Sequence, residues 1–168
     1  EMEELGATLA GRLRAGDLVA LNGKLGAGKT TLTRGLGRAL GVRGAVTSPT
    51  FVLARTHPRA DGVPLVHVDA YRLSSAADLD DLDLDYEGSI VVVEWAAGML
   101  DGVADSWLEI DIVRPTGATA AAGIDPANVA LEALEAFDAF EEFAEFEVVE
   151  PREVTITGRG PRFEDFKL

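Results

Sequence analysis

The sequence predicts an α/β fold, with one domain built on a mixed, largely parallel β-sheet and helices on both faces of that sheet. Two observations carry this prediction. The apolar run at residues 18–21 leads through a glycine-rich turn into a helical pattern, and a second apolar run at 90–93 has the composition of a strand buried on both faces. Apolar strands that alternate with helical segments are typical of parallel sheets covered by helices.

The first elements follow from spacing and from glycine. Leu5, Leu9 and Leu13 recur every four residues, which predicts an opening helix with one apolar side that ends before Gly16. The strand at 18–21 and the glycine-rich turn come next. A helix is expected over 30–40, and Gly41 is its C-terminal stop.

The later elements are mostly strands. Residues 51–55 and 65–69 flank a loop with proline and glycine, so we predict a hairpin there. A short helix is expected over 76–82. After the buried-type strand at 90–93, polar and apolar residues alternate over 107–112, as in a half-exposed strand, and 154–157 offers one more strand.

The turn after the first strand carries a phosphate-binding pattern. Residues 23–30 read Gly-Lys-Leu-Gly-Ala-Gly-Lys-Thr, which satisfies G-x-x-x-x-G-K-[ST] between a strand and a helix, the context that a P-loop requires. Glycines let successive N–H groups approach phosphate oxygens, Lys29 reaches the β- and γ-phosphates, and the Thr30 hydroxyl ligates Mg²⁺. We therefore expect a P-loop NTPase fold whose nucleotide-binding residues are Gly23, Leu25, Gly26, Ala27, Gly28, Lys29, Thr30 and Thr31.

Hydrolysis also needs carboxylates that hold the metal and orient water. Asp69 and Glu94 each end an apolar strand, where ligands bind in doubly wound sheets. They are the candidates for these roles, although either acid alone could be an ordinary exposed strand-end residue. The calcium-like run Asp81-x-Asp83-x-Asp85 lacks the glycine that such a loop needs, and two isolated histidines do not suggest a zinc site.

Charge and composition exclude several classes. The 168 residues hold 29 acidic and 15 basic side chains, a net charge of −14, without the Lys and Arg clusters that nucleic-acid binding requires. We expect tRNA to be contacted only through partners. There is no cysteine, no apolar run of about 18 residues and no signal pattern at the start, so we expect a cytoplasmic protein without a membrane span.

An acidic insertion is expected at residues 116–151 within the single domain 1–168. It contains nine carboxylates and no Lys or Arg. Its apolar residues recur every third position, which rotates by about 300° per step on a helix and forms no single stripe. The segment is either a solvated excursion or a docking segment for a partner. The apolar residues are Leu131, Leu134, Phe137, Phe140, Phe143 and Phe146.

Together, the motifs resemble one family, the bacterial ATPase of tRNA threonylcarbamoyladenosine biosynthesis called TsaE. The resemblance rests on the P-loop followed by Thr31, on Ser-Pro-Thr-Phe at 48–51, on His-Val-Asp-Ala-Tyr-Arg at 67–72 and on Glu-Trp at 94–95, in matching order and spacing. It covers roughly residues 5–115 and 152–163. The acidic insertion lies outside it.

The resemblance implies roles for residues that spacing alone does not assign. Asp69, Glu94, Lys29 and Thr50 are implied to act in hydrolysis, with Thr50 on a switch-like loop that senses the γ-phosphate. Asp69 and Glu94 are implied to join Thr30 around Mg²⁺. Tyr71, Arg72 and Trp95 are implied to matter for hydrolysis or for coupling to partners. Taken without the family, the two aromatic side chains could fill the core and Arg72 could pair with an acid.

The resemblance also implies cofactors and partners. The cofactors are ATP and Mg²⁺. The partners are the threonylcarbamoyl transferase subunit and its paralogous scaffold subunit, of the TsaD and TsaB type, and ATP turnover resets their complex. Two rival readings stay open: a small-molecule kinase on the same core, and a regulatory module that binds ATP without hydrolysing it.

Overall fold

The computed structural model describes residues 1–114 and 151–168 of the chain. Residues Glu1–Val113 and Glu153–Leu168 form one compact unit, to which every element below belongs, and Arg114–Arg152 form a second unit. Apart from Pro151, the predicted acidic insertion at 116–151 lies outside the described residues. The expectation of one domain with an insertion therefore stays a prediction.

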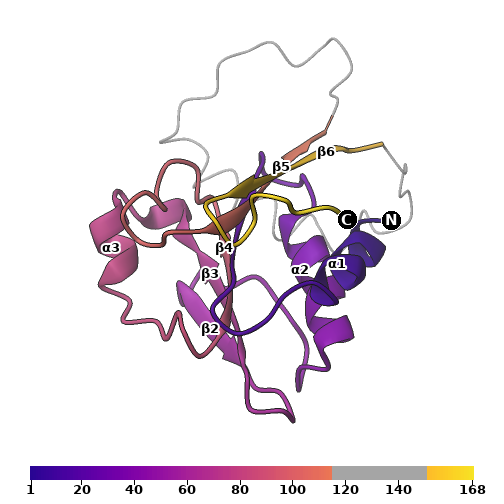
Figure 1. Cartoon of the computed structure of the whole chain (residues 1–168), viewed down its shortest axis with the longest axis horizontal. Helices are drawn as coiled ribbons and strands as arrows, with labels where there is room; N and C mark the ends of the chain where they lie inside the picture. The colour runs from indigo at the N-terminus through magenta and orange to yellow at the C-terminus, as the bar shows by residue number, and fades with distance from the viewer. Residues whose placement is uncertain (115–150) are drawn as a thin grey trace. The chain divides into compact units, whose positions relative to one another are not determined.

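A six-stranded mixed sheet forms the centre of this unit, in the order β2-β3-β4-β1-β5-β6 (Figure 1). The four central strands run parallel, and each edge strand pairs antiparallel with its neighbour. This confirms the predicted largely parallel sheet and the predicted hairpin. The strands are β1 (Leu18–Asn22), β2 (Ala54–His57), β3 (Leu65–Asp69), β4 (Ile90–Glu94), β5 (Trp107–Val113) and β6 (Glu153–Arg159).

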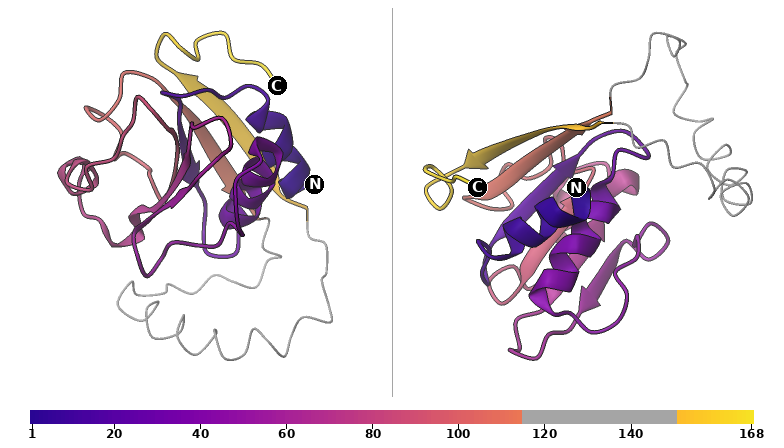
Figure 2. Two further views of the ribbon diagram at one scale, coloured as in Figure 1. Left: turned by 90° about the horizontal axis from the view of Figure 1, so that it is seen from below. Right: turned by 90° about the vertical axis from the view of Figure 1, so that its right-hand side faces the viewer.

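Helices cover both faces of the sheet, as predicted. Helices α1 (Met2–Ala10) and α2 (Lys29–Leu40) lie together on one face (Figure 2), where Leu9 and Leu36 join a core cluster with Val19 and Val92. On the other face, Leu79 of α3 (Ala76–Asp80) packs into a second cluster with alternate strand residues. A 3-10 turn, η1 (Ala70–Arg72), follows β3 directly.

The contact between α1 and α2 depends on small residues. A Cβ atom on Gly35 of α2 would overlap the backbone of Glu3 in α1, so only glycine lets the two helices approach this closely. Helix α2 then ends at Gly41 in the left-handed conformation, whose N–H bonds back to the Arg38 and Gly37 carbonyls. This confirms the predicted stop.

Two sequence expectations were wrong in their limits. The opening helix ends at Ala10, and a turn closed by the Arg14 N–H bond to the Asp17 carboxylate replaces its last part, although Leu13 still packs on the core. The strand expected at 51–55 begins only at Ala54, because Leu53 has a positive φ of 65° and leaves the extended conformation.

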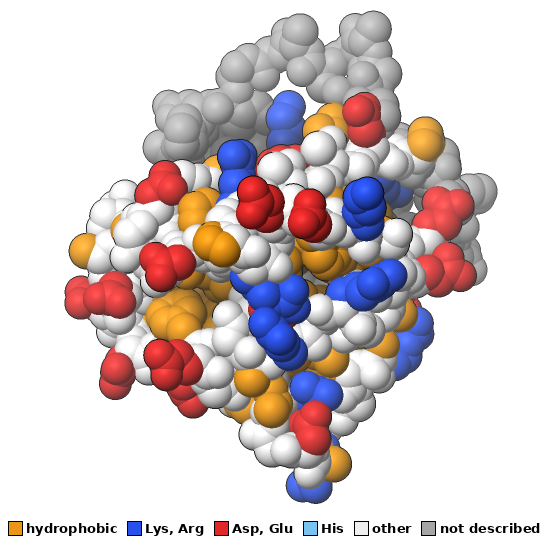
Figure 3. Space-filling model, in the orientation of Figure 1, with side chains coloured by type: hydrophobic (Ala, Val, Ile, Leu, Met, Phe, Trp, Pro, Cys, Tyr) orange, Lys and Arg blue, Asp and Glu red, His pale blue; other side chains and the backbone are white. Residues whose placement is uncertain are grey.

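Acidic and basic side chains share the surface of the described part. In Figure 3, Lys and Arg side chains gather near the middle of the visible face, with Asp and Glu around them. Nine of the 29 acidic residues fall in the 36 residues that the structure does not describe. Within the described ranges, no helix is long and apolar enough to cross a membrane.

Candidate functional site

The predicted site residues meet where β1, β3 and β4 end. Because β3 and β4 are parallel, their last residues, Asp69 and Glu94, lie side by side in register. Glu94 is also in register with Leu21, just before the glycine-rich turn. The sheet therefore brings two strand-end acids to the loop that carries Lys29 and Thr30.

The loop after β1 has the conformation that its glycines allow. Gly23 has a φ of 147°, and a Cβ there would lie 2.5 Å from the Ile112 carbonyl oxygen; Gly28 is left-handed with a φ of 111°. Gly28 caps α2 without any side-chain hydrogen bond, so the first N–H groups of that helix are left for another acceptor. A bent loop at a helix N-terminus is a site for anions.

The remaining loop residues differ in exposure. Ala27 is buried, whereas Leu25 at the apex is 69% exposed. Thr31 is half-buried in the first turn of α2. The structure thus places five of the eight predicted nucleotide-binding residues in the loop between β1 and α2, and the other three, Lys29, Thr30 and Thr31, in the first turn of α2.

The Lys29 side chain lies inside this loop. Its Nζ donates to the carbonyl oxygens of Gly23 at 2.7 Å and Lys24 at 3.2 Å, and it sits 3.7 Å from the centre of the Trp95 ring. Burial lowers the pKa of the Lys29 ammonium from its usual value, and the carboxylates of Glu94 and Asp69 oppose that shift. Lys29 is thus a buried cation beside two acids.

The two acids are buried and hydrogen-bonded. Glu94, 3% exposed, accepts at Oε1 from the Thr30 hydroxyl at 2.8 Å. Asp69, 4% exposed, accepts at Oδ2 from the Thr50 hydroxyl at 2.6 Å and at Oδ1 from the Tyr71 N–H at 3.0 Å. Thr30 therefore orients the Glu94 carboxylate, and Thr50 and Tyr71 orient the Asp69 carboxylate.

These groups offer a cation only oxygen atoms. Thr30, Asp69 and Glu94 supply one hydroxyl and two carboxylates, the hard donors that fit Mg²⁺. Among the described side chains, no group of three or more His, Cys, Asp or Glu residues is arranged to hold a metal. A cation at this place would therefore use the Thr30 hydroxyl together with two acids, and not a purely acidic or histidine cage.

The segment before β2 borders the same site. The Arg72 guanidinium donates to the Thr50 carbonyl at 2.6 Å, and the hydroxyls of Ser48 and Thr50 lie 2.7 Å apart. The next residues, Phe51 and Val52, are 77% and 55% exposed. This explains the wrong strand limit above: these apolar residues belong to an exposed loop at the rim and not to the sheet.

The three residues implied to matter for hydrolysis or for coupling follow the two acids in the chain: Tyr71 and Arg72 come after Asp69, and Trp95 comes after Glu94. Tyr71, 42% exposed, packs edge-to-face on Trp95 with ring centres 5.2 Å apart. Trp95 has a positive φ of 63°, an unusual conformation for a bulky residue. The backbone at Trp95 thus turns sharply directly after Glu94, and the indole covers the Lys29 ammonium.

Sequence reasoning missed the part played by His67. Its Nε2 lies 2.8 Å from Glu94 Oε1, and the residue is fully buried. The sequence carries a signal for this role. Residues two apart on a strand point to the same face of the sheet, so His67 lies on the same face as Asp69. The motif at 48–51 also contains Ser48, whose hydroxyl lies 2.7 Å from the Thr50 hydroxyl.

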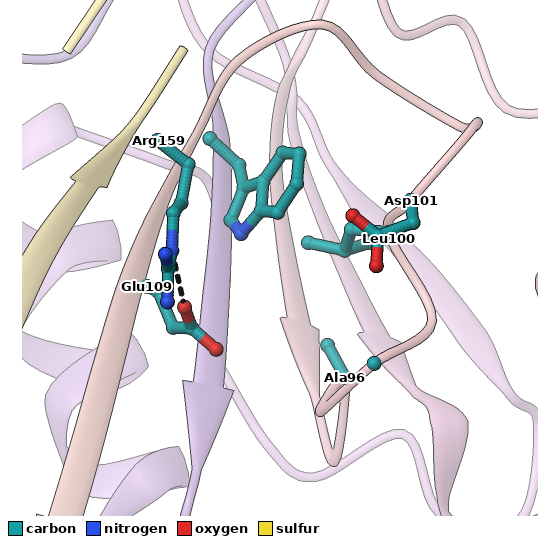
Figure 4. A pocket seen from close by; sticks show the side chains of 7 residues that line it. Ala96, Leu100, Asp101, Glu109 and Arg159 are labelled. Carbon is teal, nitrogen blue, oxygen red and sulfur yellow. Dashed lines mark hydrogen bonds and ion pairs between the residues drawn. The ribbon is translucent and has the colours of Figure 1, made fainter. Parts of the chain in front are cut away.

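A separate hollow lies elsewhere on the unit. It has a volume of about 270 Å³ and is lined by Ala96, Gly98, Leu100, Asp101, Trp107, Glu109 and Arg159. In Figure 4 the Glu109–Arg159 ion pair stands on one side, and Leu100 and Asp101 lie on the other. None of the predicted nucleotide-binding or metal-binding residues lines this hollow.

Comparison with known proteins identifies the family. The family model described as threonylcarbamoyl adenosine biosynthesis protein TsaE matches residues 1–120. The tRNA threonylcarbamoyladenosine biosynthesis protein TsaE of Streptomyces coelicolor is 62% identical over 123 residues, which cover 71% of this chain and 83% of that protein. The protein of the same name from Mycobacterium bovis is 49% identical over 66% of this chain and 71% of its own length.

A solved structure agrees with these sequence matches. The crystal structure of Bacillus subtilis YdiB superposes with a TM-score of 0.55 at 31% identity, covering 69% of this chain and 72% of that one. Sequence and fold therefore point the same way, as the motifs predicted. This chain belongs to the TsaE family of tRNA threonylcarbamoyladenosine biosynthesis proteins.

Proposed function

We propose that this chain is a Mg²⁺-dependent ATPase that serves the threonylcarbamoylation of tRNA adenosine. The observation that carries the proposal is the 2.8 Å hydrogen bond from Thr30 to Glu94, which joins the glycine-rich loop to a strand-end acid. Asp69 lies in register beside that acid. Loop, hydroxyl and two carboxylates together form the minimum that triphosphate hydrolysis requires.

In this proposal the loop holds the triphosphate. The Ala27 N–H already bonds the Lys24 carbonyl, so the remaining N–H groups of the loop and of the first turn of α2 would meet the phosphate oxygens. Lys29 would turn from the loop carbonyls to the β- and γ-phosphates. Its buried position strengthens that interaction because little water screens it. The Gly23 and Lys24 carbonyls hold the ammonium in place before the phosphates arrive.

The acids and Thr50 act on the reacting end. When bound, Mg²⁺ would neutralise the charge that develops on the phosphate oxygens. Thr30, Asp69 and Glu94 are the residues that would hold it. Water then adds to the γ-phosphorus as the bond to the β–γ bridging oxygen breaks, so that ADP leaves and the protons of water pass to the phosphate product and to solvent. The Thr50 hydroxyl donates to Asp69 and the Thr50 carbonyl accepts from Arg72, and these two bonds position the switch-like loop beside that phosphate.

The proposed partners are suggested by the family and by the exposed apolar side chains that border the site. Curated relatives bear the name of tRNA threonylcarbamoyladenosine biosynthesis, so we propose a transferase subunit and its paralogous scaffold, of the TsaD and TsaB type, as partners. Exposed apolar side chains at Leu25, Phe51, Val52 and Tyr71 border the site and offer contact area. A partner seated there would sense whether ATP or ADP is bound, and tRNA would be contacted through that partner.

A reconstitution tests the proposal. The protein, ATP and Mg²⁺ are added to the transferase, the scaffold and unmodified tRNA, and modified adenosine is counted over several turnovers. We expect repeated turnover with the wild-type chain and at most one round with Lys29→Ala or with a non-hydrolysable ATP analogue. Repeated turnover with the analogue would show that binding alone suffices and would favour the regulatory module.

A further inference from the structure

We infer that His67 is a positioning residue that fixes the Glu94 carboxylate so that one chosen oxygen faces the nucleotide site. The inference rests on the proposed function, since it assigns a role around that same site. It stands on the hydrogen bonds and burial of three residues, His67, Glu94 and Thr30.

His67 is an unusual residue for its place in the sheet. It is fully buried in β3, between Val66 and Val68 in sequence and in register with Val92. A buried imidazole without a hydrogen bond costs free energy that a valine there would not. A specific partner is therefore needed to explain the histidine.

Glu94 is that partner. His67 Nε2 lies 2.8 Å from Glu94 Oε1, and Nδ1 has no hydrogen-bond partner within the described residues. An ionised carboxylate only accepts hydrogen bonds, so the proton of a neutral His67 must be on Nε2. In that tautomer the ring donates a hydrogen bond to Glu94 Oε1.

The same oxygen also receives the Thr30 hydroxyl at 2.8 Å. A carboxylate oxygen has two lone-pair directions, and His67 and Thr30 together use both on Oε1. Oε2 accepts no hydrogen bond from the described residues and is not among the side-chain atoms sealed from solvent. His67 and Thr30 therefore turn Glu94 so that Oε2 is its free oxygen, available to a water molecule or a cation.

The neighbouring strand supplies a matched control. His57 in β2 is also buried, at 3% exposed, and its Nε2 has no hydrogen-bond partner among the residues described. It pairs with Leu65, two residues before His67. A substitution at His57 thus perturbs a buried histidine of the same sheet without touching Glu94.

The first experiment compares His67→Leu, His67→Gln and His57→Leu. Leucine removes the donor, whereas the glutamine amide can replace Nε2–H. Partners that orient metal ligands change metal affinity or activity by about 10- to 100-fold. We expect His67→Leu to lower kcat and raise the Mg²⁺ concentration needed for half-maximal binding of a fluorescent ATP analogue by that factor. Affinity for the analogue without Mg²⁺ should stay within about threefold, and His67→Gln should recover most of the loss.

Equal effects of His67→Leu and His57→Leu, or no recovery with glutamine, would overturn the inference. If His67→Leu does not fold, nitrogen-15 NMR of the wild-type imidazoles decides the question. We expect His67 as the Nε2–H tautomer, and an Nδ1–H tautomer would overturn the inference. Wild-type protein that binds nucleotide with Mg²⁺ but does not hydrolyse it would refute the proposed ATPase and leave the His67 inference standing.

Discussion

The ammonium of Lys29 lies 3.7 Å from the centre of the ring of Trp95, the residue that follows Glu94 in the chain. Trp95 reaches this position because its backbone leaves the strand with a positive φ of 63°. Tyr71 supports the indole from one edge. A cation held against an aromatic face and two carbonyl oxygens is stabilised without phosphate, so Lys29 must exchange these contacts when it binds a nucleotide.

That exchange should be visible in tryptophan fluorescence. The chain has two tryptophans, and Trp107→Phe leaves Trp95 as the reporter. We expect MgATP to change the emission of this variant, because the ammonium moves from the ring toward the phosphates. In Trp95→Phe, the remaining Trp107 should respond little. Unchanged Trp95 emission at nucleotide concentrations that calorimetry shows to be saturating would contradict the exchange.

The free energy of unfolding should increase as pH rises, because the Lys29 ammonium is buried. Burial lowers the pKa of Lys29 from its ordinary value of 10.5, so the charged form is disfavoured in the fold. Below the folded-state pKa the penalty is fully present. Between that pKa and 10.5 the unfolded chain binds more protons, so stability rises with pH.

The measurement is urea unfolding from pH 7 to pH 10 for wild type and Lys29→Met. The free energy of unfolding of wild type should increase relative to the variant as pH rises. Lys24→Met, which removes an exposed lysine from the same loop, should show no such trend relative to wild type. A difference between wild type and Lys29→Met that is constant with pH would refute the prediction.

Hydrolysis should depend on the two acids more than binding does. Asp69→Asn and Glu94→Gln keep the side-chain size and remove the charge that holds the metal. We expect kcat to fall about 100-fold or more, with the ATP dissociation constant changed less than tenfold. The exposed Asp81→Asn is the control for loss of one negative charge. Normal turnover in both variants would remove these residues from the site.

The Thr50 hydroxyl should affect the rate of hydrolysis, because it donates a hydrogen bond to the Asp69 carboxylate. Thr50→Val keeps the shape but leaves Asp69 Oδ2 without its 2.6 Å donor. We expect kcat to fall about tenfold, since hydrogen bonds to charged groups contribute about 1.5–3 kcal/mol. Thr56→Val, at an exposed position of β2, should leave steady-state turnover unchanged. An equal response of the two variants would argue against a role for the Thr50 hydroxyl.

Stability should depend on close contact between α1 and α2. Gly35→Ala would place a Cβ against the backbone of Glu3, so the helices must separate at a cost of about 1–3 kcal/mol. Gly11→Ala is the control, because Gly11 has a φ of −69° and ordinary space around its Cβ. Urea unfolding should show the loss for Gly35→Ala only. Equal stability of the two variants would show that α1 can move without cost.

Local pattern predicted much of the fold because its signals are short-range. The strand, loop and helix around Gly23 and Thr30 were predictable because glycine, lysine and threonine at fixed spacing suit one conformation. The limits of the strand near Phe51 were not predictable from local pattern. Apolar, β-prone residues favour a strand on average, but here Phe51 and Val52 lie exposed on a loop at the rim of the site.

The family and the α/β class could be predicted from the sequence alone, because they depend on composition, spacing and motif order, and the same pattern predicts a phosphate site in the glycine-rich loop. That Asp69 and Glu94 end side by side and that His67 reaches Glu94 became clear only in the folded chain. Those contacts follow from the order and register of strands distant in the chain. A short stretch of sequence can show which residues share a face of one strand, as His67 and Asp69 do. It does not show which distant strands pair or in what register, so those contacts are visible only when the sheet is assembled.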